Sequence, residues 1–288
     1  MTPVPPRAAS APAPRSWRPS PTIRASVAVH VGAAAVAMAH QSAWPLSLAA
    51  VAANHLTLAA AGLWPRSRLL GPNRTRLPAG GAAGTVILTL DDGPDPEVTT
   101  RVLDTLDAHD ARATFFCIGE RVMRHAGLAR AIVARGHEIH NHSHSHSNLF
   151  AVLGPRGLKR EVQLAQQAIR EATGQVPLFF RAPAGLRNPF LEPVLADAGL
   201  ELVSWTRRGF DTVSRRAEVV LSRLTRELAA GDILLLHDGN SARTSAGNAV
   251  AVEVLPALLA QLRSLQLQPV TLGAALTRAP AEAASASS

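Results

Sequence analysis

Two adjacent aspartates, Asp91 and Asp92, stand just after a strand-like run at residues 86–90 and just before a Gly-Pro pair. Neighbouring carboxylates repel each other, so such a pair is kept most easily when the two groups have different roles. A bound metal ion separates the roles, because one carboxylate binds the ion and the other stays free to accept a proton from water. The alternative is a plain turn, since Asp, Gly and Pro are typical turn formers.

A histidine-rich segment, HEIHNHSHSHSNL, occupies residues 137–149. Two pairs in it, His142 with His146 and His140 with His144, have the spacing His-x3-His, which on one helical turn places both rings on the same face and suits a metal ion. The spacing does not choose between the pairs, and a histidine-rich stretch without a function is the alternative. With one of the two aspartates, either pair completes a ligand set that suits catalytic zinc and also non-haem iron.

Alternating strands and helices are expected to position these side chains. Seven strand-like runs follow residue 84, near 86–90, 113–118, 137–141, 178–181, 201–205, 232–236 and 268–272. Helix-like segments fill the gaps, near 97–109, 120–134, 155–173, 189–198, 215–229 and 249–266. Repeated strand–helix units predict a parallel sheet or barrel, and seven strands predict a barrel that is one unit short of eight.

Polar side chains follow five of these predicted strands. They are Asp91 and Asp92, His142 and His146, Arg181, Asp211, and His237. In parallel α/β barrels, active sites collect at the carboxyl ends of the strands. We therefore expect these residues, which are far apart in the sequence, to meet on one rim of the sheet and form an active site.

The excess positive charge of the chain lies in its first 90 residues. The chain has 288 residues and a formal net charge of +8, and the first 90 residues hold eight of its 29 basic residues and no acidic one. The remainder has 21 basic and 21 acidic residues and is neutral. This distribution argues against a nucleic-acid partner and favours charge that flanks a membrane segment.

Two uncharged apolar stretches, residues 25–43 and 44–64, are each long enough to cross a hydrocarbon core of roughly 30 Å. Trp44 and Trp64 suit the membrane interfaces, and arginines flank the pair on both sides. We expect a two-helix hairpin in the inner or plasma membrane, with both ends and the catalytic domain on the cytoplasmic side. The alternatives are a cleaved signal peptide with a small-x-small site at 37–39, and an interfacial or soluble helical pair.

The remaining segments complete the expected domain organisation. Residues 1–24 are rich in Pro, Ser, Ala and Arg and are expected to form a disordered basic tail. Residues 65–84 have the composition of a linker, residues 85–275 form the catalytic domain, and the Ala/Ser-rich residues 276–288 form a frayed tail.

Five motifs, in order, resemble those of the NodB-homology polysaccharide deacetylases, carbohydrate esterase family four. They are TLDDGP, NHSHSHSNL, RAPAG, SWTRRGFDT and LLLHD, and they extend over residues 85–273. The resemblance implies a distorted (β/α)7 barrel, which agrees with the strand count. It also implies a metal-dependent hydrolase that removes N-acyl, typically acetyl, groups from an amino sugar in a glycan or glycolipid, with one divalent metal ion, most simply Zn2+.

The resemblance assigns roles to the residues of the first three motifs. Asp92, His142 and His146 match the metal ligands of the family, which selects one of the two histidine pairs. Asp91 matches the catalytic base, and Arg181 matches the arginine that orients this base. His144 then falls between the two ligand histidines and has no assigned role.

The later motifs supply the catalytic acid and the substrate contacts. His237 matches the general acid, and Asp211 matches the carboxylate that raises the pKa of this acid. Leu235 matches the apolar residue of the acetyl pocket, the backbone N–H of Ala184 is expected to hold the oxyanion, and Trp205 is assigned to substrate binding.

The sequence departs from the family pattern where a sugar would be gripped. Ala182 and Ala184 replace a proline and an aromatic residue, Thr212 replaces a tryptophan, and Leu90 replaces a phenylalanine. These smaller side chains do not affect the catalytic residues, but they mean that the motifs do not identify the substrate. One alternative is deformylation or deacetylation of a lipid-linked amino sugar at the cytoplasmic membrane face. Less favoured are an inactive membrane-tethered carbohydrate-binding domain, which would be expected to lose Asp91 or His237, and a non-haem iron oxygenase.

Overall fold

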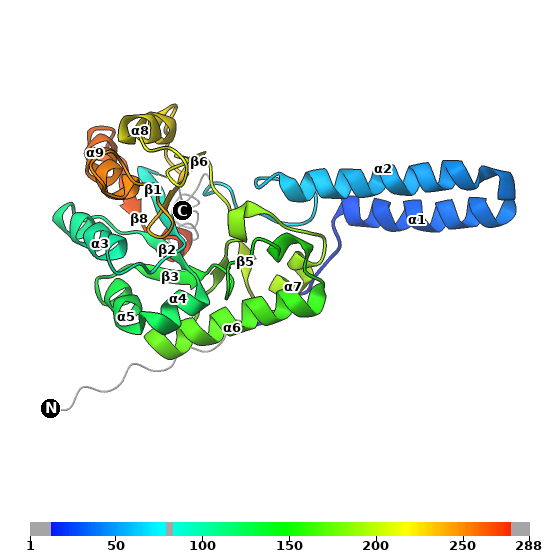
Figure 1. The fold of residues 1–288 in the computed structure, drawn as a ribbon, viewed down its shortest axis with the longest axis horizontal. Coiled ribbons are helices and arrows are strands. Elements are labelled where there is room, and N and C mark those ends of the chain that lie inside the picture. The colour runs from blue at the N-terminus through cyan, green and yellow to red at the C-terminus, as the bar shows by residue number, and fades with distance from the viewer. Residues whose placement is uncertain (1–12, 79–82, 278–288) are drawn as a thin grey trace, which may run out of the picture.

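The computed structural model describes residues 13–78 and 83–277. Figure 1 shows two parts, a rounded α/β domain and a long hairpin of two helices that projects from it. The hairpin comes from the N-terminal part of the chain, and the α/β domain follows it. The predicted tails at residues 1–24 and 276–288 lie partly outside the described residues, as does part of the linker predicted at 65–84.

The domain is built on one curled parallel sheet whose strands follow the order β5-β4-β3-β2-β1-β7-β6, with β8 paired to β1 off this path. The strands are β1 (Thr85–Asp91), β2 (Thr114–Cys117), β3 (Glu138–Asn141), β4 (Phe179–Phe180), β5 (Glu201–Leu202), β6 (Arg207–Arg208), β7 (Ile233–His237) and β8 (Gln268–Val270). All seven predicted strands are present and the short β6 is added, so the distorted barrel is confirmed as an open half-barrel.

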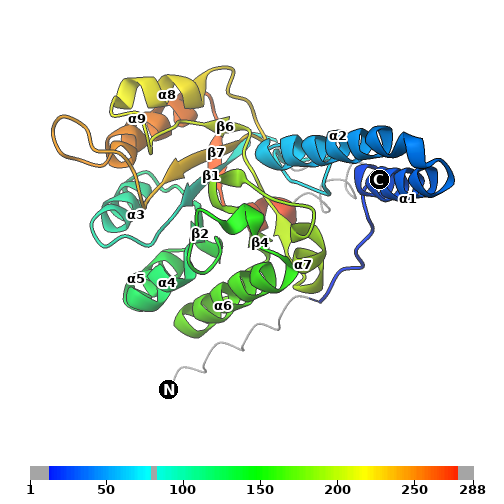
Figure 2. The same ribbon diagram turned by 45° about the vertical axis from the view of Figure 1, so that its right-hand side comes forward.

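Helices cover the outside of the curled sheet (Figures 1 and 2). They are α3 (Val98–Ala108), α4 (Gly119–Arg124), α5 (Ala126–Ala134), α6 (Pro155–Thr173), α7 (Leu191–Asp197), α8 (Ala217–Thr225) and α9 (Val250–Ser264), with short 3-10 turns at Phe150–Val152 and Pro183–Gly185. The single helix predicted at 120–134 is two helices, because His125 leaves the helical region with φ −126° and ψ 45°.

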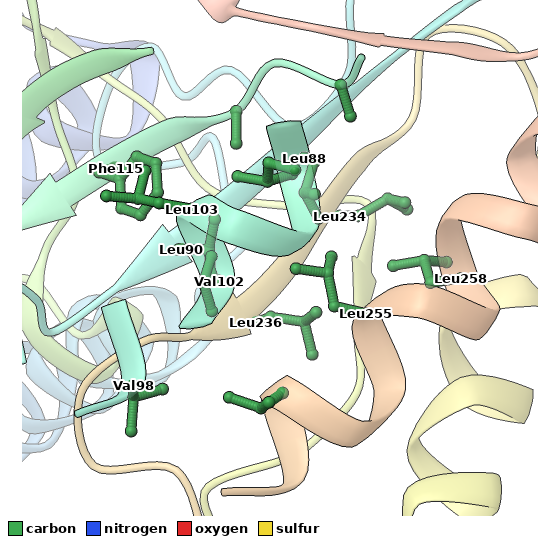
Figure 3. Packing of buried hydrophobic residues seen from close by; sticks show 14 of the residues in the cluster. Leu88, Leu90, Val98, Val102, Leu103, Phe115, Leu234, Leu236, Leu255 and Leu258 are labelled. Atoms are coloured by element: carbon green, nitrogen blue, oxygen red, sulfur yellow. The ribbon is translucent and has the colours of Figure 1, made fainter. Parts of the chain in front are cut away.

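Side chains alternate between the two faces of a strand, and this alternation decides which side chains of β1 point into the half-barrel. On one face of β1, Leu88 and Leu90 pack against α3 and α9, together with residues of β2 and β7 (Figure 3). On the other face, Ile87 joins a second buried cluster inside the half-barrel, and Thr89 and Asp91 continue that face toward the carboxyl end of the strand. Both faces are buried, as parallel strands require, so an inward-facing aspartate at the strand end is held in a rigid frame.

The N-terminal hairpin consists of α1 (Pro21–Ala39) and α2 (Trp44–Leu63), joined by a 3-10 turn at Gln41–Ala43. Each helix, the second together with this turn, is long and apolar enough to cross a membrane by length and composition. Polar groups on the two helices meet each other: Asn54 donates to the Ser26 hydroxyl at 2.9 Å, and the rings of His30 and His55 pack edge to face at 5.1 Å. Such contacts are typical of helices that associate in an apolar environment.

The segments on either side of the hairpin pack on the domain. The first helix begins at Pro21, four residues before its predicted start, and the preceding Arg15 donates its backbone N–H to Ala196 at 2.8 Å. After the hairpin, Arg74 exchanges backbone hydrogen bonds with Leu202 and Ser204, and Leu77 donates to Gly231. The described part of the predicted linker is therefore tied to the edge strand β5 and to the residue pair that precedes β7. It holds the base of the hairpin against the domain.

Candidate active site

Asp92, His142 and His146 come together at the carboxyl edge of the sheet, and we call them the Asp-His-His cluster. Asp92 directly follows β1, and the two histidines lie in the loop after β3. The Nε2 atoms of His142 and His146 lie 3.2 and 3.1 Å from Oδ1 of Asp92. The three ligand atoms lie within 4.8 Å of one another, with Asp92 and His142 buried and His146 half-buried. The sequence singled out the same three residues.

The chemistry of this cluster fits a cation. The His142 Nδ1 lies 2.8 Å from the backbone oxygen of Arg181, which can only accept, so Nδ1 carries the ring proton and Nε2 is an acceptor. This acceptor faces Oδ1 of Asp92, a buried oxygen with no hydrogen-bond partner among the described residues. A divalent metal ion satisfies such a set of nitrogen and oxygen ligands.

The loop that carries the histidines is not the helical turn on which their spacing was interpreted. Ser143 and His146 have φ values of 62° and 52°, in the left-handed region. Short side chains stabilise this path, because Asn141 Oδ1 accepts from the backbone N–H of Ser143 at 2.9 Å and Ser143 Oγ accepts from that of His146 at 3.1 Å. Asn and Ser compete with helical hydrogen bonding in this way. The prediction of a shared helical face was therefore wrong, although the two rings still converge.

The other histidine pair does not join the cluster. His140 is buried, with Nε2 3.2 Å from a carboxylate oxygen of Glu138 and its ring 4.8 Å from that of Phe179. It fills the interior of the half-barrel beside β4, a structural role that the sequence left without explanation. His144 points toward Gly119 of α4, where a Cβ atom would lie only 2.6 Å from its Nδ1. The spacing alone could not separate these pairs, but the fold does.

Asp91 is held by one buried arginine. Arg181 donates from Nη1 to Oδ1 of Asp91 at 2.6 Å and to Thr89 at 2.7 Å. Its other nitrogens donate to the backbone oxygens of Val203 and Ser204, and its guanidinium stacks 4.1 Å from the ring centre of Phe116. With every edge engaged, the guanidinium cannot turn away. The second oxygen of Asp91, Oδ2, lies 3.8 Å from His142 Nε2, beside the Asp-His-His cluster.

His237 stands next to Asp91, because the register of β1 and β7 pairs these two residues. Both carboxylate oxygens of Asp211 contact it: Oδ1 lies 2.9 Å from Nδ1, and Oδ2 accepts the backbone N–H at 2.8 Å. Burial lowers the pKa of His237, but the Asp211 carboxylate outweighs it and raises that pKa to about 9. This is the direction that the sequence analysis expects for the pKa of His237. Because Nδ1 is engaged, Nε2 is the ring atom left for chemistry.

These groups line one cavity of about 220 Å³, which we call the rim cavity. Its walls are Asp91, Asp92, His142, His146, Ala184, Gly185, Trp205, Arg208, Thr212, Leu235, His237 and Asn240. All predicted site residues are in this wall except Arg181 and Asp211, which stand behind Asp91 and His237 and position them.

Sequence reasoning missed two polar residues of this wall, Asn240 and Arg208. Asn240 donates from its amide to Oδ2 of Asp92 at 3.0 Å and accepts from Arg121, which also donates to the backbone oxygen of Asp92. This network fixes the carboxylate of the cluster from behind. The signal for Asn240 was its place two residues after LLLHD, on the same rim as the other strand ends. Arg208 lies inside the SWTRRGFDT motif, where Trp205, Asp211 and Thr212 were singled out and Arg208 was not.

Comparison with known proteins places these observations in a family. The family model described as polysaccharide deacetylase matches residues 80–203. A chitooligosaccharide deacetylase of Sinorhizobium fredii is 38% identical over 167 residues, which cover 58% of this chain and 77% of that protein. A peptidoglycan-N-acetylglucosamine deacetylase of Bacillus cereus is 35% identical over 178 residues, which cover 61% and 82%.

Solved structures give the same picture of the fold. A family 4 carbohydrate esterase from Streptomyces lividans, in complex with acetate, aligns with a TM-score of 0.59 and 31% identity over 65% of this chain and 92% of that one. A CE4 family pseudoenzyme from Bacillus anthracis aligns with a TM-score of 0.63 and 26% identity over 71% and 69%. Because one neighbour is a pseudoenzyme, likeness of fold does not establish activity. The side chains of the rim cavity must carry that argument.

Proposed function

Since this chain belongs to the polysaccharide deacetylase family, we propose that it removes the acetyl group from an N-acetylated amino sugar, with one divalent metal ion held by Asp92, His142 and His146. One observation carries the proposal. An arginine-held aspartate and an aspartate-held histidine stand on neighbouring strands beside the Asp-His-His cluster. A base, an acid and a cation site within one cavity can together hydrolyse an amide.

Asp91 is placed to act as the general base. When bound, the metal ion supplies a Lewis acid that polarises the acyl carbonyl and the attacking water. Asp91 takes a proton from that water as its oxygen bonds to the carbonyl carbon. Arg181 fixes one oxygen of Asp91 and leaves the other facing the cluster. The backbone N–H of Ala184, in the wall of the rim cavity, donates to the oxyanion that develops.

His237 is placed to act as the general acid. As the carbon–nitrogen bond breaks, its electron pair goes to the sugar nitrogen, which takes a proton from Nε2 of His237. The products are acetate and a free amino sugar. Asp211 holds Nδ1 of His237, so the ring presents the right atom and stays cationic until it donates.

The rim cavity favours a small part of a glycan over a long stretch of one. Its volume of about 220 Å³ suits one acylated sugar unit, with Leu235 and Trp205 as apolar walls. Ala184 and Thr212 provide no large side chain on the approach to it. The alternative of an inactive carbohydrate-binding domain is disfavoured, because both the base and the acid are retained with their positioning partners.

The test is release of acetate from N-acetylglucosamine oligomers by the full-length protein in detergent. Acetate and free amine should appear in equal amounts with the metal-loaded protein and fall to background after removal of the metal by a chelator. Acetate release that is unchanged in the metal-free protein, verified by elemental analysis, would contradict the metal dependence. No acetate from the metal-loaded protein with any N-acetylated amino sugar would contradict the proposed activity.

The acid–base pair leads to a pH prediction for Asp211→Asn. The cationic form of His237 is needed to protonate the leaving amine, and Asp211 raises the pKa of this ring to about 9. A cation at the Asp-His-His cluster repels the imidazolium, so we expect kcat/KM of the wild type to fall on an alkaline limb at or below about pH 9. In Asp211→Asn the limb should move to lower pH, since burial then lowers the pKa without opposition.

Profiles of kcat/KM against pH for the two proteins measure this shift. The stability of the folded protein should change in the same direction. Because the pKa of His237 is higher in the folded than in the unfolded state, His237 stabilises the fold at pH values below its unfolded-state pKa. This stabilisation is lost as the pH rises through the folded-state pKa of about 9. An alkaline limb at the same pH in both proteins would rule out the role given to Asp211.

We also propose that α1 and α2 anchor the protein in the inner or plasma membrane, with the catalytic domain on the cytoplasmic side. Arginines flank the hairpin at both ends, and its tip at residues 40–43 has no formal charge. A C-terminal green fluorescent protein fusion should therefore fluoresce, and a C-terminal alkaline phosphatase fusion should be inactive. Active phosphatase would instead place the domain outside and would direct attention to cell-wall or exported glycans.

A further inference from the structure

A second, larger cavity of about 690 Å³ lies beside the rim cavity, at the base of the hairpin. The end of α2 and the following residues form one wall, the segment around β6 forms another, and α8 forms the third. The lining residues are Trp64, Pro65, Arg66, Trp205, Thr206, Arg207, Arg208, Phe210, Ser222, Arg223 and Arg226. The two cavities share Trp205 and Arg208, so one ligand could occupy both. We call the larger one the arginine cavity.

The charge of this cavity is of one sign. Five of its lining residues are arginines and none is acidic. Arg207 is committed to the fold, since its Nε lies 3.0 Å from a carboxylate oxygen of the buried Asp232. The other four have no ion pair with a carboxylate of residues 13–78 or 83–277; they are Arg66, Arg208, Arg223 and Arg226. Unpaired guanidinium groups around one cavity are suited to a multivalent anion, above all a phosphate group.

Arg208 connects this charge to the catalytic side. Its guanidinium carbon lies 5.3 Å from the ring centre of Trp205 and 4.8 Å from that of Phe210, so aromatic faces hold it in place. Its Nε is buried and has no hydrogen-bond partner among the described residues. Arg223 contacts the same Phe210 ring, at 5.5 Å. Arg208 lines both cavities, so an anion at their boundary would meet its guanidinium group.

The end of the hairpin helix α2, which borders the arginine cavity, is apolar. Leu63 is the last residue of α2 and Trp64 follows it, and the two are 65% and 61% exposed. Trp64 lies next to Pro65 and Arg66 in the cavity wall. Figure 2 shows α2 reaching the domain at this point, with the rest of the hairpin projecting away from it. Ser204 donates to the backbone oxygen of Pro65 at 2.7 Å and Arg187 donates its backbone N–H to that of Gly62 at 3.2 Å, which fixes the helix end to the domain.

We infer that the arginine cavity binds the phosphate or diphosphate group of a lipid-linked substrate. Three environments follow one another in space: the rim cavity for the acylated sugar, the arginine cavity for the anion, and the apolar hairpin for the hydrocarbon chain. A membrane lipid with a sugar joined through phosphate has the same three parts in the same order. The inference rests on the proposed deacetylase function and names its substrate class.

The first experiment compares three substrates with the full-length, metal-loaded protein in nanodiscs. All three contain N-acetylglucosamine. The first is N-acetylglucosamine joined to a polyprenol through a diphosphate, and the second is the same sugar diphosphate without the lipid. The third is an uncharged N-acetylglucosamine oligomer. We expect kcat/KM to be at least about tenfold higher for the lipid-linked substrate than for the uncharged one, through a lower KM. The double variant Arg223→Gln/Arg226→Gln should bring this ratio close to one. Arg156→Gln, an exposed position of α6 outside the cavity, is the matched control and should keep the ratio.

The possible results of this comparison test the phosphate site and the lipid part of the inference separately. Equal kcat/KM for the lipid-linked and uncharged substrates, with no response to the arginine variants, would overturn the inference and leave the deacetylase proposal standing. An equal advantage for the sugar diphosphate without a lipid would assign the anion to a soluble substrate and overturn the lipid part.

A binding measurement keeps the inference testable without turnover. Inorganic pyrophosphate is titrated calorimetrically into metal-free full-length protein, so that a metal ion cannot bind the probe. Binding by the wild type and by Arg156→Gln that weakens at least about tenfold in Arg223→Gln/Arg226→Gln would support the site. Equal binding by all three proteins, or none by the wild type, would overturn it even if deacetylation fails for a separate reason.

Discussion

His142→Ala should abolish metal binding and, with it, turnover. His142 is fixed on both sides, because its Nδ1–H donates a hydrogen bond to the backbone oxygen of Arg181 and Asp92 Oδ1 lies 3.2 Å from its Nε2. Removal of one of three converging ligands leaves Asp92 with a single histidine, and we expect a loss of metal affinity well beyond the roughly 10- to 100-fold that changes to supporting residues produce. Mass spectrometry of the purified protein should find close to one equivalent of metal in the wild type and almost none in the variant.

The matched control is His144→Ala. His144 has the same residue type and lies two positions away in the same loop, but its ring points toward Gly119 and not into the cluster. It should keep its metal, and its turnover should stay within a few-fold of the wild type. Equal metal content in His142→Ala and the wild type would refute the assignment of the cluster. Metal loss in His144→Ala alone would move the site to the other histidine pair.

The sequence was sufficient to predict which residues meet, because the fold converts strand ends into neighbours. Asp91 and His237 are 146 positions apart, yet each ends an apolar run. In a parallel sheet the carboxyl ends of neighbouring strands lie at the same edge, so the two residues become neighbours. The period of two places Ile87, Thr89 and Asp91 on one face of β1, and the structure shows that this face lines the half-barrel.

The local conformations were beyond the reach of the pattern. His142 and His146 have a spacing that is typical of a helical face, but Asn141 and Ser143 bond to the backbone and keep the loop in a left-handed path. Spacing constrains a helix or a strand, whereas a loop depends on side-chain hydrogen bonds that no period encodes. For the same reason Asn240, which supports Asp92 from a loop after β7, had no periodic signal.

The arginine cavity was missed for a different reason. Its charges come from the SWTRRGFDT motif, from α8 and from the segment that leaves the hairpin, and no single stretch of sequence contains them. The arginines of the first 90 residues were expected to flank membrane segments. In the structure Arg66 belongs both to that flank and to the cavity. Charge that is spread along a chain reveals a site only when the fold has brought it together.

Asp91→Asn should leave the metal in place and remove most of the turnover. Asn has nearly the shape of Asp but cannot accept a proton from water at neutral pH, and the ligands Asp92, His142 and His146 are unchanged. Loss of a positioned general base lowers kcat by roughly 100- to 10,000-fold. In this variant a neutral amide replaces the carboxylate that pairs with Arg181, so the buried guanidinium loses its counter-charge.

Because that lost charge could reduce stability, folding and metal content must be measured beside the rate. Asp110→Asn is the matched control: the Asp110 side chain is 92% exposed, its φ of 48° is one that Asn tolerates, and within the described residues its carboxylate has one ion pair, a long one of 3.7 Å to Arg112. It should behave as the wild type in every assay. A folded Asp91→Asn with full metal and a kcat within threefold of the wild type would exclude Asp91 as the base. A protein with full metal and little turnover would place proton transfer, and not metal retention, on Asp91, so that each of the two adjacent aspartates has its own role.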